Sequence, residues 1–155
     1  MNQFMAEAIR EAERGIARGH GGPFGAVVVR GGKIVGRGHN QVIKQNNPTA
    51  HSEIVAIADA GRRLKTHDLA GCDIYMTGEP CVMCLCATMW ANIDNVYYGC
   101  TLQDNENIGF RDEKFEIALN IDRSRVKFPG ITQLDRDHCV QLFERYRALP
   151  NRKTY

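Results

Sequence analysis

The sequence contains no apolar run near the roughly 20 residues that a membrane-spanning helix needs. Its opening residues, Met1 to Phe4, lack a charged segment followed by an apolar one, so we expect no secretory signal. No internal repeat, low-complexity tract or Pro/Ser-rich linker interrupts the chain. These absences predict a single domain over residues 1–155, a cytoplasmic location and no membrane partner.

An excess of charge of one sign is also missing, because 20 basic and 18 acidic residues leave a net charge of +2. Residues 123–155 hold eight basic and three acidic side chains, but residues 102–122 offset them with six acidic and two basic ones. A solvated helix face explains this local surplus without a phosphate-binding surface. We therefore expect no nucleic-acid partner.

Cysteine, in contrast, is present six times. A chain of 155 residues buries enough surface to fold without disulfide bonds. In a cytoplasmic protein, cysteines are more often free thiols or metal ligands than disulfide partners. The six cysteines are therefore expected to be free thiols or metal ligands.

Apolar periodicity predicts alternating helices and strands. The expected elements are helices over 2–18, 51–63 and 135–148, a helix beginning near Pro80, strands over 24–30, 33–39, 72–77 and 94–100, and a strand within 125–134. Gly31 and Gly32 separate the first two strands and are typical of a hairpin turn. Residues 102–122 are acidic and show no clear period. The alternation predicts an α/β domain whose sheet is covered by helices.

Two short segments carry the chemistry of a metal site. The first contains His51 and Glu53 in the pattern His-x-Glu, and the second is Pro-Cys-x-x-Cys with Cys81 and Cys84. One imidazole and two thiolates make a three-ligand zinc site whose fourth position stays open, which is the catalytic arrangement. Cys81 and Cys84 are three residues apart, so the start of a helix places both on one face. Unpaired N–H groups at a helix start favour their thiolates.

Glu53 completes the arrangement, because a base must take the proton of a water that zinc activates. A structural zinc site is the first alternative, but it needs four protein ligands. Cys86 lies on another part of the helix, and His67 lies in an apparent surface turn. A redox Cys-x-x-Cys pair is the second alternative, and it would not need the His-x-Glu pattern. A catalytic site of His51, Cys81, Cys84 and Glu53 is therefore favoured.

With these motifs the sequence resembles the cytidine deaminase-like superfamily of zinc-dependent deaminases. The resemblance implies a three-layer α/β/α fold with a mixed five-stranded sheet, one Zn²⁺ per subunit, and hydrolytic release of ammonia from an aminated ring carbon. The segments 21–26, 38–40, 47–51 and 81–84 are similar to the purine-acting branch, which includes bacterial guanine deaminases and tRNA adenosine deaminases. Trp90, residues 108–113 and residues 151–155 make it most similar to the bacterial guanine deaminases.

The resemblance also implies which residues contact the substrate. These are Phe24, Asn40, Ala50, Trp90, Asp112 and Tyr155. Asn40 would hydrogen-bond the ring, Phe24 would stack near it, Trp90 would line the pocket and Ala50 would offer backbone groups. Tyr155 would close the site, in a homodimer whose C-terminal segments can be exchanged between subunits. The alternatives are core aromatics for Phe24 and Trp90, a turn residue for Asn40, and a frayed end for Tyr155.

Arg111 marks a departure from the resemblance, which implies an acidic residue directly after Gly109-Phe110. Either Asp112 takes that place, or Arg111 changes the preferred ring. Guanine contains a 2-amino-4-oxopyrimidine unit, and isocytosine is that unit alone. The resemblance implies guanine as the substrate, and the departure at Arg111 leaves isocytosine or cytosine as the alternative.

The expected mechanism gives Glu53 two tasks. It takes a proton from the attacking water and passes it to a ring nitrogen, and it then returns a proton to the leaving amine. Editing of adenosine in tRNA is a competing function, and it would make binding depend on salt. A zinc-stabilised binding module without turnover is another, and ammonia release separates it from an enzyme.

Overall fold

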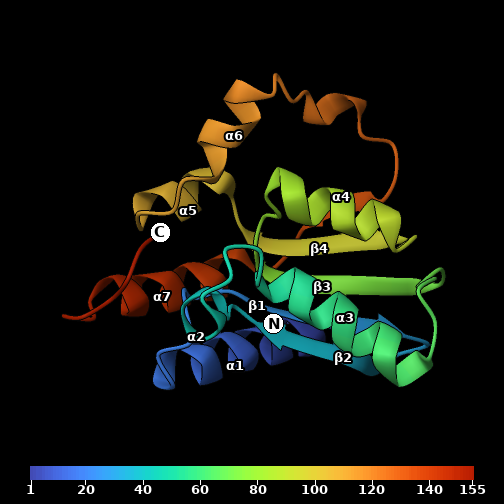
Figure 1. Ribbon diagram of the computed structural model, residues 1–155, viewed down its shortest axis with the longest axis horizontal. Coiled ribbons are helices and arrows are strands. Elements are labelled where there is room, and N and C mark those ends of the chain that lie inside the picture. Colours follow the sequence, from blue (N-terminus) through green and yellow to red (C-terminus); the bar gives the residue numbers. More distant parts are fainter.

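A mixed sheet of five strands runs through the computed structural model, which describes all of residues 1–155 (Figure 1). The strands are β1 (Gly25–Arg30), β2 (Lys33–His39), β3 (Cys72–Gly78), β4 (Asn95–Cys100) and β5 (Gly130–Gln133). Their order is β2-β1-β3-β4-β5. β1 pairs with β2 and β3 in the antiparallel sense, whereas β3–β4 and β4–β5 are parallel. The predicted mixed five-stranded sheet is confirmed.

Helices cover both faces of the sheet, as the three-layer prediction requires (Figure 1). The longer helices are α1 (Gln3–Ala17), α3 (Ser52–Leu64), α4 (Val82–Trp90) and α7 (Arg136–Arg147). β1 shows how the faces divide. Ala26 and Val28 pack with Ala56 of α3, whereas Val27 packs with Phe4 of α1 on the other face. This two-residue alternation is the period of a strand that is buried on both sides.

Most boundaries follow from local sequence signals. The Asn2 side chain accepts hydrogen bonds from the N–H groups of Phe4 and Met5 and so caps α1. Gly31 and Gly32 both have positive φ angles, which the hairpin turn between β1 and β2 requires. The helices and strands that apolar periodicity predicted are all present.

The acidic stretch 102–122 contains structure that periodicity did not predict. It forms two short helices, α5 (Leu102–Asn107) and α6 (Asp112–Ala118), and a 3-10 turn follows over Arg123–Arg125. A capping box between Thr101 and Asp104 starts α5. A further short helix, α2 (Val42–Gln45), follows β2. No helix in the chain combines the length and apolarity that crossing a membrane demands.

Candidate active site

The proposed metal ligands meet where two helices begin. His51 is the N-cap residue of α3, and Cys81 is the N-cap residue of α4. Nδ1 of His51 lies 3.7 Å from Sγ of Cys81 and 3.6 Å from Sγ of Cys84. All three ligand atoms lie within 4.8 Å of one another. One nitrogen and two sulfur donors at this spacing fit a zinc ion with an open fourth position.

The three ligand side chains shift one another's pKa values. The hydrogen bond from Cys84 and the neighbouring His51 lower the pKa of Cys81 to about 4, although burial opposes the change. Burial lowers the pKa of His51, but the hydrogen bond with Cys81 and the charges of Cys81 and Glu53 outweigh it and raise the value to about 9. The hydrogen bond with Cys81 and burial raise the pKa of Cys84. The cluster therefore contains one thiolate before any metal binds.

Glu53 lies in the first turn of α3, two residues after His51, and its side chain is buried. The hydroxyl of Ser52 donates a hydrogen bond of 2.7 Å to Oε2 of Glu53. Burial raises the pKa of Glu53 above its ordinary value. A carboxylate with a raised pKa can both accept a proton and return it, which is the chemistry predicted for Glu53.

A cavity of about 180 Å³ opens beside these residues. It is lined by Phe24, Asn40, Val42, Pro48, His51, Glu53, Glu79, Cys81, Asn105, Phe110, Arg111, Asp112, Phe115 and Tyr155. Four of the six predicted substrate contacts therefore line the same cavity as the predicted base and two of the metal ligands. The structure thus brings together segments that lie more than 100 residues apart in the sequence.

Asn40 presents one end of its amide to this cavity. Its Oδ1 accepts hydrogen bonds from the N–H of Val42 at 3.1 Å and from the hydroxyl of Tyr155 at 2.5 Å. With Oδ1 held by the chain itself, the amide nitrogen is the group left to meet a ligand. Asn40 therefore offers hydrogen-bond donors to the cavity.

Phe24, which precedes β1, and Asp112, which begins α6, both line the cavity. Phe24 packs edge-on against Phe110 and Phe143, with ring centroids 4.9 Å and 5.4 Å away, so it is both a core aromatic and a cavity wall. Asp112 accepts a hydrogen bond of 2.9 Å from Nδ2 of Asn105, and burial raises its pKa. Asp112 thus reaches the cavity although Arg111 stands directly after Phe110.

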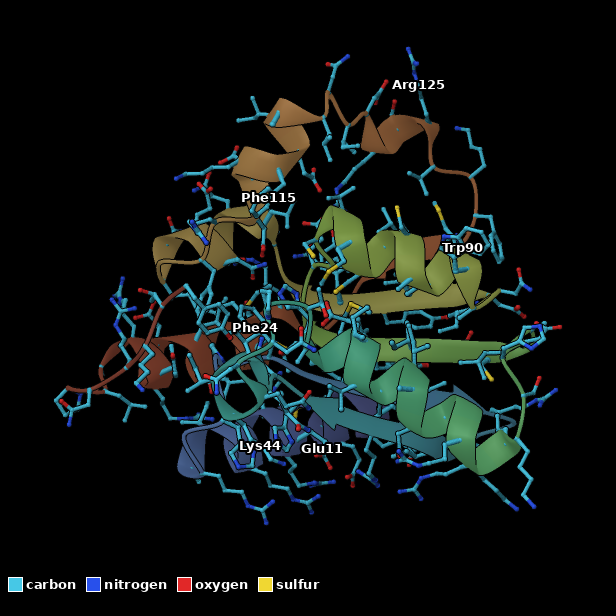
Figure 2. The ribbon with its side chains drawn as sticks, viewed as in Figure 1. Glu11, Phe24, Lys44, Trp90, Phe115 and Arg125 are labelled. Atoms are coloured by element: carbon cyan, nitrogen blue, oxygen red, sulfur yellow. The ribbon has the colours of Figure 1, made fainter.

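Two of the predicted contacts do not line this cavity. Trp90 is the last residue of α4 and is 85% exposed, outside the cavity (Figure 2). It follows Cys81 by nine residues, which places it about 13 Å along the helix and on the opposite side. Ala50 does not line the cavity either. Its N–H donates to the carbonyl of Asn47, and its carbonyl accepts from the N–H of Gln41, so both backbone groups serve the loop.

Several cavity residues escaped the sequence prediction because they belong to the short elements after β4. Asn105 lies on α5, and the spacing of Thr101 and Asp104 was the signal that could have located this helix. Arg123 does not line the cavity but donates a hydrogen bond of 2.7 Å to the carbonyl of Pro80. It also contacts Glu79 at 3.3 Å. Arg123 thereby ties the segment after α6 to the loop that carries Cys81.

Comparison with known proteins identifies related deaminases. The family model for the cytidine and deoxycytidylate deaminase zinc-binding region matches residues 1–100. Among curated proteins, guanine deaminase of Bacillus subtilis is 36% identical over 154 residues, covering 98% of this chain and 97% of that protein. A tRNA-specific adenosine deaminase of Aquifex aeolicus is 43% identical over 95 residues, covering 61% of this chain and 62% of that protein.

Solved structures of guanine deaminases are also similar to this chain. The crystal structure of Bacillus subtilis guanine deaminase matches with a TM-score of 0.74 and 35% identity, covering 100% of this chain and 99% of that one. A guanine deaminase from Nitrosomonas europaea matches with a TM-score of 0.77 and 31% identity, covering 94% and 84%. A complex of the protein NE0047 with 2,6-diaminopurine matches with a TM-score of 0.82 and 30% identity, covering 96% and 82%.

Proposed function

The chain belongs to the cytidine and deoxycytidylate deaminase zinc-binding family and is a zinc-dependent nucleobase deaminase, and we propose that its substrate is free guanine, which it hydrolyses to xanthine and ammonia. The observation that carries this proposal is that Glu53 and Tyr155 line one small cavity together. A cavity of about 180 Å³ with Tyr155 in its wall suits a free base. A base that remains attached to a polynucleotide would need an open path for its backbone.

We propose that His51, Cys81 and Cys84 hold the zinc ion, because their donor atoms match its preferences. Bound there, zinc supplies the Lewis acidity that makes a water nucleophilic at neutral pH. Glu53 accepts the first proton of the attacking water and delivers it to the ring nitrogen next to the aminated carbon. Glu53 then moves the proton of the new hydroxyl group to the amine, so that ammonia departs and the ring keeps its carbonyl.

The remaining cavity residues orient the ring in this proposal. The amide nitrogen of Asn40 donates to a ring carbonyl or ring nitrogen, because its oxygen is already bonded to Val42 and Tyr155. The carboxylate of Asp112 accepts a hydrogen bond from a ring N–H or amino group. Phe24 supplies an apolar face to the base. Guanine carries both the donors and the acceptors that these groups need.

A specific observation keeps isocytosine as a second candidate. Arg111 lines the cavity next to Asp112, at the position where the family resemblance implies an acid. A cationic side chain there changes what the imidazole half of a purine would meet. Isocytosine presents the same 2-amino-4-oxo edge as guanine without that half, so it would avoid Arg111.

The remaining parts of the proposal concern assembly and location. We propose a cytoplasmic, single-domain protein that forms a homodimer without nucleic acid. The hydrogen bond of Tyr155 to Asn40 of the same chain supports a tail that contributes to its own cavity. Exchange of tails in a dimer would replace this contact with the same contact from the partner.

Ammonia release by the zinc-loaded protein tests the proposed substrate. The panel is guanine, isocytosine, cytosine, adenine, cytidine and deoxycytidylate. We expect the highest kcat/KM for guanine, and no effect of moderate salt because no phosphate is bound. A higher kcat/KM for isocytosine would transfer the assignment to the smaller ring. Strongly salt-dependent activity on tRNA alone would support the adenosine-editing function, and no reaction at all would support a binding module.

A further inference from the structure

Behind Asn40 lies a group of titratable side chains that does not line the cavity. Nδ1 of His20 lies 2.9 Å from Nε2 of His39, at hydrogen-bond distance. Nδ1 of His39, the other ring nitrogen, lies 3.5 Å from a carboxylate oxygen of Glu11. Glu11 and His39 are buried, and His20 is half-buried. Glu11 belongs to α1, His39 ends β2, and His20 lies in the turn after α1.

The packing around His39 is built to receive an imidazole. Gly15, in the last part of α1, faces it so closely that a Cβ there would come within 2.8 Å of the ring. Any larger residue at position 15 would displace the ring, so the absence of a side chain there makes room for His39.

Both histidines are joined to the segments that hold Asn40. His39 precedes Asn40 directly, and the carbonyl of His20 accepts hydrogen bonds of 3.1 Å from the N–H groups of Ile43 and Lys44. Gly21, which follows His20, has Oδ1 of Asn40 only 2.1 Å from the site of a Cβ. A change in the distance between the two imidazoles would therefore move Gly21 relative to Asn40.

The hydrogen bond between the two imidazole rings depends on how many protons the pair carries. A hydrogen bond between two imidazole nitrogens needs a proton on one of them and a lone pair on the other. The pair can take one extra proton on an outer nitrogen and keep this bond. A second extra proton places two N–H groups face to face and two positive charges on adjacent rings, which breaks the contact.

The charges that face the pair come from three elements. On α1, Glu11 binds Arg14 at 2.7 Å, and Arg18, which directly follows α1, lies near His20. On β2, Arg37 contacts both Glu7 and Glu11. On α2, Lys44 lies near His20. Glu11 is therefore the carboxylate that balances a first proton on the pair, and the surrounding cations oppose a second.

Resting on the proposed function, we propose that His20 and His39 are positioning residues that hold Asn40 toward the base, and that a second proton on this pair sets the acid limit of substrate binding. Burial and the charge of His39 lower the pKa of His20, in keeping with resistance to that proton. The pair affects how tightly the base binds, whereas Glu53 affects the chemical step. The two effects are therefore expected in different kinetic constants.

Steady-state kinetics from pH 8.5 to pH 5 test the proposal with the most active base of the panel. In the zinc-loaded wild-type protein, KM should rise about tenfold for each pH unit below the second protonation. His39→Gln keeps a donor and an acceptor but does not titrate, so its KM should stay flat. His39→Ala should raise KM several-fold already at pH 8. His67→Gln, on the exposed turn before β3, is the matched control and should follow the wild type.

Zinc content and thermal melting are measured for every variant at each pH, so that loss of metal or of fold is separated from loss of positioning. A KM that stays constant in the wild type would overturn the proposal. So would an unchanged acid rise of KM in His39→Gln.

A second measurement does not depend on turnover. NMR titration of the histidine side chains of the zinc-loaded wild type should show His20 and His39 taking up protons in two separated steps. In His39→Gln, His20 should titrate in a single step, and His67 should be unaffected. Independent, single-step titration of both histidines in the wild type would overturn the proposal. If no base in the panel reacts but the two steps are seen, the proposed substrate fails while the coupled pair stands.

Discussion

The hydroxyl of Tyr155, the last residue of the sequence, donates a hydrogen bond of 2.5 Å to Oδ1 of Asn40, which follows β2. The same hydroxyl accepts a hydrogen bond of 3.0 Å from the N–H of Gly22. One phenol group thus joins the C-terminal segment, the loop before β1 and the residue after β2. This relationship explains why Asn40 has a fixed orientation beside the cavity.

Replacing Tyr155 by phenylalanine removes both hydrogen bonds and keeps the ring that packs against Phe110. Only the hydrogen bond to Asn40 orients a group that contacts the base. We therefore expect KM for the base to rise about two- to tenfold, since one net hydrogen bond contributes roughly 0.5–1.5 kcal/mol. kcat should change less, because Glu53 is untouched. Steady-state kinetics measure both constants. Tyr97→Phe, on β4, is the control, and an equal rise of KM there would point to a general loss of packing.

Asn40→Asp tests which end of the amide serves the substrate. The new carboxylate can still accept from Val42 and Tyr155, but it has no N–H to donate and it adds a negative charge. We expect kcat/KM to fall about five- to a hundredfold, the range for leaving one polar partner unsatisfied. The control is Asn107→Asp on the exposed side of α5. An active Asn40→Asp enzyme would mean that the oxygen, rather than the nitrogen, contacts the base.

Glu53→Gln removes the base while keeping the shape of the side chain and an oxygen for the Ser52 hydroxyl. Turnover should fall by at least about 10²- to 10⁴-fold, the usual contribution of general acid–base catalysis. The zinc content should remain at one per chain, because the metal ligands are intact. Metal analysis and ammonia release are compared with Glu13→Gln, an exposed change on α1. Substantial activity in Glu53→Gln would remove Glu53 from the mechanism.

Much of this arrangement could be predicted because it depends on short-range patterns. His51 and Glu53 lie two residues apart, and Cys81 and Cys84 lie three apart, so each pair is placed by the start of its own helix. The strands β1 and β3 carry short apolar runs that are typical of strands buried on both faces of a sheet. These features need no knowledge of distant contacts.

What the sequence could not show depends on contacts between remote segments. α5 and α6 are too short and polar to have a period, and Asn105 reaches the cavity only because α5 packs beside β3 and β4. The hydrogen bond between His20 and His39 joins the turn after α1 to the last residue of β2, and their approach depends on how α1 packs on the sheet. Trp90 is a different case, since helical geometry already places it on the side of α4 opposite Cys81.

Asp59 provides a prediction about stability. Burial raises the pKa of its carboxyl, but hydrogen bonds from Arg63, the N–H of Arg37 and Arg62 outweigh burial and lower it. Since the folded pKa lies below the unfolded one, this stabilisation is complete above the unfolded pKa and is lost as pH falls through the folded value. Asp59→Asn should therefore cost about 1–3 kcal/mol at pH 7 and much less near pH 3.

Urea unfolding at the two pH values measures this difference. The control is Asp137→Asn on the exposed start of α7, which should change stability by less than about 0.5 kcal/mol. A cost of Asp59→Asn that is equal at both pH values would show that the charge of Asp59 does not contribute.

Zinc removal is expected to stop turnover without unfolding the chain. The raised pKa of His51 and the lowered pKa of Cys81 favour opposite charges on the two side chains without a metal, and the apolar clusters on the two faces of the sheet do not include the three ligands. Zinc present at 1,000 times its Kd would add about 4 kcal/mol to stability. A chelator should therefore lower the melting temperature and abolish ammonia release, and added zinc should restore both.

Cys84→Ser should lose the metal, whereas Cys86→Ser, on the exposed side of α4, should keep it. Full activity in chelated, metal-free protein would contradict the assignment of the cluster.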